Sequence, residues 1–187
     1  MRLNQSQNNK PTTVNGLLKT ITILVLALSF TALIIGGFWI FKNQAPIPSE
    51  VINPDGEVLM TSKTIKGGQA VFQKYGLMDY GTVLGNGSYM GPDYTAEALK
   101  IYTEGMQHYK AQNDYNRSFN DLGDKEKAVV KDQVINEMRQ NRYDEEEDIL
   151  YVTDAQAYGI EQVEEYYRDI FENGDDWGLK AGLINES

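Results

Sequence analysis

The longest apolar run in this 187-residue chain lies near its N-terminus, from Thr20 to Phe41. It carries no charge, and Lys19 and Lys42 flank it. A helix rises about 1.5 Å per residue, so this run is long enough to cross the roughly 30 Å hydrocarbon layer of a bilayer. We predict an uncleaved transmembrane helix over residues 17–42. A buried helix of a soluble protein and a cleaved signal peptide fit less well, because their apolar stretches are shorter.

The charges beside the apolar run predict its direction in the cell membrane. Arg2, Lys10 and Lys19 precede it, whereas Lys42 is soon followed by carboxylates that begin with Glu50. Short cytoplasmic segments carry an excess of Lys and Arg. We therefore expect a single-pass protein with a cytoplasmic N-terminus and an extracytoplasmic domain.

The segments on either side of this run lack apolar periodicity. Residues 1–16 are rich in Asn, Gln, Ser and Thr and are predicted to form a disordered cytoplasmic tail. Residues 43–58 contain Ala45-Pro46-Ile47-Pro48, in which each proline disfavours helix, and a turn sequence at Asn53-Pro54-Asp55-Gly56. We interpret residues 43–58 as an extended linker and residues 59–187 as one domain.

Apolar positions in the domain recur every three to four residues, which is typical of helices that pack on partners. Four helices are predicted, over residues 63–75, from residue 94 onward, over residues 121–140 and over residues 153–173. Thr153 and Gln156 have the spacing of a capping box at the start of the last helix. Residues 149–152 are compatible with a short strand. The apolar positions that define the helix faces are Val71, Tyr75, Leu99, Tyr102, Met106, Tyr109, Val130, Val134, Met138, Ile160, Val163, Tyr167 and Ile170.

Composition limits the chemistry that this chain can perform. It contains no cysteine, which excludes disulfides, thiolate metal sites and thioether-linked haem. Four of its 17 basic residues lie at or before Lys42, so residues 43–187 combine 27 carboxylates with 13 basic residues, a formal net charge of −14. Such a domain repels nucleic acid and anionic lipid.

The remaining candidate sites have simpler interpretations. The single histidine, His108, is predicted to lie on a helix surface and not to be a metal ligand or general base. The acidic run at residues 144–148 lacks the ligand spacing of a calcium loop. Gly85, Gly87 and Gly91 do not follow the dinucleotide-binding fingerprint. We assign no catalytic, cofactor-binding or metal-binding residue.

The segment between the first two predicted helices carries a family resemblance. The motifs occur in the order Tyr75-Gly76-Leu77-Met78-Asp79-Tyr80-Gly81, Gly91-Pro92-Asp93-Tyr94-Thr95-Ala96, Asn141-Arg142-Tyr143-Asp144 and Leu150-Tyr151-Val152-Thr153. Together they resemble the N-terminal anchor helix and haemless cytochrome c-like domain of the quinol-dependent nitric oxide reductases. They are also similar to the cytochrome c subunit of nitric oxide reductase. The resemblance covers roughly residues 15–180.

The resemblance implies a mainly α fold, with one transmembrane helix followed by a cytochrome c-like helical domain without haem. In c-type cytochromes the corresponding helix runs into Cys-x-x-Cys-His. This pairing places the two cysteine positions at Leu77 and Tyr80 and the histidine position at Gly81, so all three haem-attaching residues are missing. The side chains expected to fill the vacated space are Leu77, Met78, Tyr80, Tyr89 and Met90.

The resemblance also implies a role in reducing nitric oxide to nitrous oxide, in denitrifying respiration or in detoxification. The haem and non-haem iron of that reaction are held by histidines in a multi-helix membrane bundle, which one membrane segment and one histidine cannot supply. We expect this chain to be the non-catalytic N-terminal portion, or a separately encoded anchor subunit, that braces the catalytic part. The metals and the quinol site are expected in that partner. The alternative is a free-standing single-pass module that binds a ligand or partner outside the cytoplasm.

Overall fold

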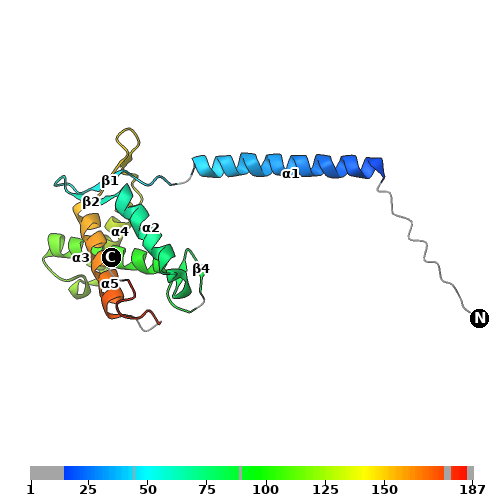
Figure 1. Cartoon of the computed structure of the whole chain (residues 1–187). Coiled ribbons are helices and arrows are strands. Elements are labelled where there is room, and N and C mark those ends of the chain that lie inside the picture. The colour runs from blue at the N-terminus through cyan, green and yellow to red at the C-terminus, as the bar shows by residue number, and fades with distance from the viewer. Residues whose placement is uncertain (1–14, 44, 89, 175–177, 185–187) are drawn as a thin grey trace, which may run out of the picture. The chain divides into compact units, whose positions relative to one another are not determined.

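The computed structural model describes residues 15–43, 45–88, 90–174 and 178–184. The chain divides into two compact units, Met1–Pro46 and Ile47–Ser187 (Figure 1). The first unit contains helix α1, Gly16–Lys42. The predicted disordered tail lies, up to residue 14, outside the described residues.

Helix α1 is apolar on all sides. None of its residues is buried, and its large side chains, such as Leu28 and Ile34, are exposed. An all-round apolar helix has no polar face to turn toward water, so its surface suits a lipid environment. Within the described part of the chain, α1 is the one helix long and apolar enough to cross a membrane. That α1 crosses a membrane, and in which direction, stays a prediction.

The second unit is mainly helical, which confirms the predicted fold class. Its helices are α2 (Ser62–Lys74), α3 (Tyr94–Tyr115), α4 (Asp124–Met138) and α5 (Asp154–Asn173), with short 3-10 turns η1 (Leu77–Asp79) and η2 (Phe119–Asp121). All four predicted helices are present, and the predicted ends lie within three residues of the observed ones. The predicted capping box forms at α5, where Thr153 Oγ1 accepts a hydrogen bond from Gln156 N at 3.2 Å.

A small sheet starts the domain earlier than the sequence indicated. Its strands run in the order β2-β1-β6-β5 and comprise Glu50–Ile52 (β1), Val58–Thr61 (β2), Tyr143–Asp144 (β5) and Ile149–Tyr151 (β6). β1 pairs antiparallel with β2 and parallel with β6, where Glu50 is opposite Ile149. The predicted linker over residues 43–58 thus supplies a central strand, and the compact unit begins at Ile47.

The core lies where α3 and α5 cross, with α4 packed beside them (Figure 1). Gly105 and Gly159 allow the close approach, since a Cβ on Gly105 would lie 3.0 Å from the Gly159 Cα. Met106 and Val130 are completely buried. Met138, predicted on the same face as Val130, is 36% exposed because it is the last residue of α4. Other predicted face residues that are at least one-third exposed are Val71 and Leu99.

Candidate functional site

The segment after α2 folds back on itself through its own backbone. Gly76 ends the helix in the left-handed conformation, with φ of +60°, and η1 follows directly. Ser88 N then donates to Met78 O at 2.9 Å, and Thr82 N donates to Pro92 O at 2.9 Å. A two-stranded hairpin, β3 (Thr82–Val83) and β4 (Asn86–Gly87), lies between these bonds. The loop is therefore held in a fixed conformation by backbone hydrogen bonds.

Gly81, which the resemblance pairs with the haem-binding histidine, has no room for a side chain. The residue is buried, and a Cβ there would lie 2.6 Å from Pro92 O and 2.7 Å from the Tyr94 Cε2 atom. On the same loop, a Cβ on Gly91 would lie 2.0 Å from Tyr80 O. At each of the two positions the nearest atom is a backbone oxygen, which cannot move aside as the end of a flexible side chain can. Glycine is therefore required at both positions by close packing.

The two residues that the resemblance pairs with the cysteines, Leu77 and Tyr80, are buried to different extents. Leu77 is 4% exposed, and its carbonyl accepts a hydrogen bond from the Tyr94 hydroxyl at 3.3 Å. Tyr80 is half-buried. The expectation that Met78 and Met90 fill the vacated space is wrong, because they are 42% and 74% exposed. Tyr89, also expected there, lies outside the described residues.

Tyr94 is the ring that packs against the loop. Its ring lies edge-on to Phe72 of α2, with centroids 6.0 Å apart, and 6.3 Å from Tyr167 of α5. The Tyr167 hydroxyl in turn donates to Tyr94 O at 3.1 Å. Burial, with the nearby Glu97 carboxylate, raises the pKa of Tyr167, so its hydroxyl stays protonated and continues to donate. This ring cluster joins α2, α3 and α5 beside the loop that the resemblance pairs with the haem motif.

Asp93 connects the hairpin to α3. Its carboxylate accepts hydrogen bonds from Thr95 N and Ala96 N at the start of the helix, and from Gly85 N at 2.6 Å in the hairpin turn. The Ala96 backbone hydrogen bond is the main cause that lowers the pKa of Asp93. The carboxylate is thus ionised at neutral pH and caps the positive end of the α3 dipole. The glycine-rich loop is fixed at both ends.

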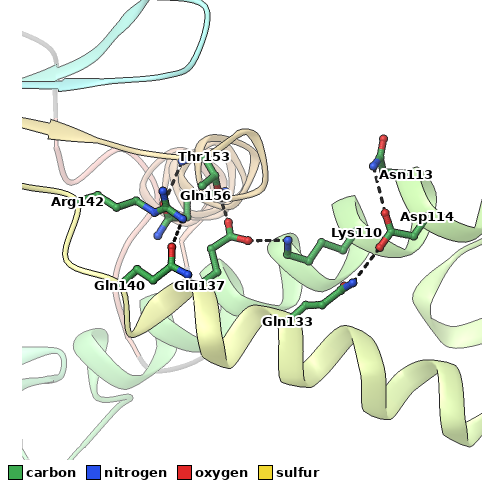
Figure 2. A network of polar contacts seen from close by, with 9 residues as sticks. All are labelled: Lys110, Asn113, Asp114, Gln133, Glu137, Gln140, Arg142, Thr153 and Gln156. Atoms are coloured by element: carbon green, nitrogen blue, oxygen red, sulfur yellow. Dashed lines mark hydrogen bonds and ion pairs between the residues drawn. The ribbon is translucent and has the colours of Figure 1, made fainter.

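A second polar cluster, centred on Glu137, joins α3, α4 and α5 (Figure 2). Glu137 lies 2.6 Å from the Lys110 Nζ and accepts a hydrogen bond from the Thr153 hydroxyl. Both charged side chains are largely buried, with exposures of 11% for Glu137 and 19% for Lys110. Burial, reinforced by Glu137, raises the pKa of Tyr102 to about 12. Because Glu137 already has two partners, we interpret this cluster as a structural connection between helices.

The described residues hold no metal-binding cluster. Among them, no group of three or more His, Cys, Asp or Glu side chains is placed to bind a metal ion. His108 is exposed and lies edge-on to Phe119, with centroids 6.3 Å apart. In the acidic turn, Asp148 accepts a hydrogen bond from the Tyr143 hydroxyl at 2.7 Å and remains exposed. His108 thus lies at the helix surface, as predicted, and Asp148 of the acidic turn is also exposed.

An apolar helix long enough to cross a membrane, followed by a mainly helical domain, defines the class of protein, a candidate membrane helix joined to a cytochrome c-like domain. A family model described as the NorB cytochrome c-like domain of nitric oxide reductase matches residues 48–187, and the chain belongs to this family. The comparison with curated proteins gave no match.

The three residues that the resemblance pairs with the haem motif, Leu77, Tyr80 and Gly81, do not fit a haem group. Covalent attachment needs thiols, and the 187-residue sequence has no cysteine. An axial ligand at position 81 would overlap the Tyr94 ring and the Pro92 carbonyl. The missing thiols were evident from the sequence, which contains no cysteine. The lack of space at position 81 was not, because it depends on how Tyr94 packs, and no local sequence signal indicates that packing.

Proposed function

We propose that this chain is the non-catalytic N-terminal portion, or a separately encoded anchor subunit, of a quinol-dependent nitric oxide reductase. In this proposal it braces the catalytic membrane part from outside the cytoplasm. The observation that carries the proposal is the family match over residues 48–187, directly after a helix suited to cross a membrane. The close packing at Gly81 supports a domain that serves as a scaffold without haem.

The chain's own residues explain why it needs a catalytic partner. The reaction combines two molecules of nitric oxide with two electrons and two protons to give nitrous oxide and water. In this family's chemistry, haem and non-haem iron perform it, and such iron needs several imidazole ligands in fixed geometry. This chain has one histidine, the exposed His108. Electrons therefore pass from quinol into the catalytic part without a relay in this domain.

The short connection between the two units favours a bracing role over a mobile carrier role. Helix α1 ends at Lys42 and the compact unit begins at Ile47, so residues 43–46 connect them. Four extended residues span at most about 14 Å. A domain on such a short tether meets a partner in the same membrane at high effective concentration. A carrier that moves between distant partners needs a longer linker.

The first expected result is that the full chain, purified in detergent, contains no haem. Thiols for attachment are missing from the sequence, and Gly81 leaves no space for an axial ligand. Absorption spectroscopy after detergent washes and dialysis checks this. A Soret band that survives those steps would show that haem binds by a route that the packing does not reveal.

The second expected result is association with the catalytic part. The tagged full chain, co-expressed with the histidine-rich multi-helix polypeptide of a reductase of this family, should co-purify with it in mild detergent. The matched control keeps residues 1–46 and replaces residues 47–187 by an unrelated soluble domain, which should not co-purify. Equal recovery with both chains, or with neither, favours the free-standing alternative.

A further inference from the structure

An apolar groove follows α5 on the surface of the domain. It has a volume of about 780 Å³ and lies between α5, α3 and the segment formed by β2 and α2. Its lining includes Leu59, Ile65, Leu99, Val163 and Phe171. Leu99 is 52% exposed although it lies on α3, the main core helix. Helix α2, which borders the groove, has no buried residue. The packing of the described residues thus leaves an open apolar surface.

One end of this groove is strongly acidic. There it continues into a second hollow of about 450 Å³, with which it shares Leu59, Ile160 and Glu164. The charged residues of that hollow are all carboxylates, namely Glu57, Asp154, Glu161 and Glu164. The groove contributes one cation, Arg168, which Glu164 already binds at 2.5 Å. Within the described residues, Asp154 and Glu161 have no cationic partner. An apolar floor with an acidic end attracts a ligand that combines apolar and cationic groups.

The charge of the domain excludes two other occupants on physical grounds. Residues 43–187 carry a formal net charge of −14, so an anionic lipid surface is repelled. A second copy of the chain that used the same groove in a two-fold contact would present the same surface, whose charged groups other than the paired Arg168 are all carboxylates. A helix with one apolar face flanked by Lys or Arg has neither defect and is a common ligand of such grooves.

We propose that this groove is the docking surface for a cationic amphipathic segment of the catalytic membrane part. This inference rests on the proposed function and specifies the surface by which the domain binds its partner. The partner's apolar side chains pack on Leu99, Val163 and Phe171, and its Lys or Arg side chains lie against Glu161 and its neighbouring carboxylates.

Site-specific photo-crosslinking tests this proposal in the full chain. A photoreactive amino acid replaces Leu99, in membranes that contain the catalytic part. We expect adducts to a segment of that part with apolar residues flanked by Lys or Arg, identified by mass spectrometry. The matched control places the same group at Ile135 of α4, which is 47% exposed and lies outside the groove, and should give no such adduct.

A pair of charge variants separates a specific contact from general attraction. Glu161→Lys should lower the yield of the adduct at position 99 at least about three-fold. Loss of one exposed charge pair accounts for that factor, and repulsion between the new lysine and the partner's cation adds to it. Asp132→Lys makes the same change of charge on α4, outside the groove, and should leave the yield unchanged. Circular dichroism confirms that both variants keep their helix content.

Three results would overturn the docking proposal while leaving the proposed function intact. In the first, the chain co-purifies with the catalytic part but position 99 forms no adduct with that part. In the second, position 99 forms adducts only to lipid or to a second copy of the chain. In the third, the Glu161→Lys and Asp132→Lys variants give equal adduct yields. A chain that fails to associate with the catalytic part at all overturns the proposed function and, with it, this inference.

Discussion

The substitution Gly81→His is expected to destabilise the domain by about 3 kcal/mol and to bind no haem. The new Cβ would lie 2.6 Å from Pro92 O and 2.7 Å from the Tyr94 Cε2 atom, so the loop or the ring has to move. Chemical denaturation followed by circular dichroism measures the change in the free energy of unfolding. Adding Leu77→Cys and Tyr80→Cys, to restore the complete motif, should still yield no covalent haem in a host that matures c-type cytochromes.

A glycine in open space provides the control for Gly81. Gly67 lies in α2 with nothing within 4 Å of an added Cβ, so Gly67→Ala should leave stability unchanged or raise it by up to about 1 kcal/mol. The substitution Gly81→Ala should also lower the free energy of unfolding. This loss should be smaller in a Tyr94→Ala background, because the Tyr94 ring, one of the two obstructing groups, is then absent. A Gly81→His protein as stable as the unsubstituted chain would show that the loop is loosely packed.

The substitution Met106→Ala is expected to lower the free energy of unfolding by about 3 kcal/mol. Met106 is completely buried and packs with Val134 and Ala155, so its truncation leaves a cavity where α3, α4 and α5 meet. The same denaturation experiment measures the loss. Met138→Ala is the matched control. Met138 is 36% exposed at the end of α4, and its truncation should cost less than about 1 kcal/mol.

Equal losses for the two methionine variants would contradict the assignment of the core to the α3–α5 crossing. A loss for Met106→Ala below about 1 kcal/mol would also contradict it, since truncation of a fully buried methionine to alanine costs about 2–5 kcal/mol. Either result would favour a core placed elsewhere, such as among the rings around Tyr94.

The helices were predictable because their signals are local. The spacing of Val130 and Val134, and the Thr153 cap with Gln156 three residues later, depend on residues within one or two turns. Met138 follows the same spacing, yet it is exposed, because burial depends on where the helix ends relative to its neighbours. Periodicity therefore located the elements better than it located the core.

Of the sheet, the sequence indicated only β6, within residues 149–152, because the pairing of the strands is remote in sequence. β1 has three residues and pairs with β6 about a hundred positions later, with Glu50 opposite Ile149. Three residues that follow a proline-rich segment are too few to show a hydrophobic periodicity, so residues 43–58 resembled a linker. Val51, which is 3% exposed, shows that this segment belongs to the folded domain.

The position of the candidate site rests on the resemblance, and its packing was not predictable from the sequence. The resemblance pairs Leu77, Tyr80 and Gly81 with the haem motif, and the missing cysteines were evident from composition. Which side chain closes the loop depends on how α3 approaches it. Tyr94 does so from the first turn of α3, whereas Met90 is largely exposed to solvent. Proximity in sequence to the motif was a poor guide to proximity in space.

The central claim, that this chain braces a reductase without catalysing the reaction, is tested most directly by nitric oxide consumption in liposomes supplied with a quinol. The full chain alone should consume no nitric oxide above the rate of empty liposomes. The catalytic multi-helix part should be active and should stay active longer when the chain is present. Quinol-dependent reduction of nitric oxide to nitrous oxide by the chain alone, with no second polypeptide in the liposome, would contradict the account.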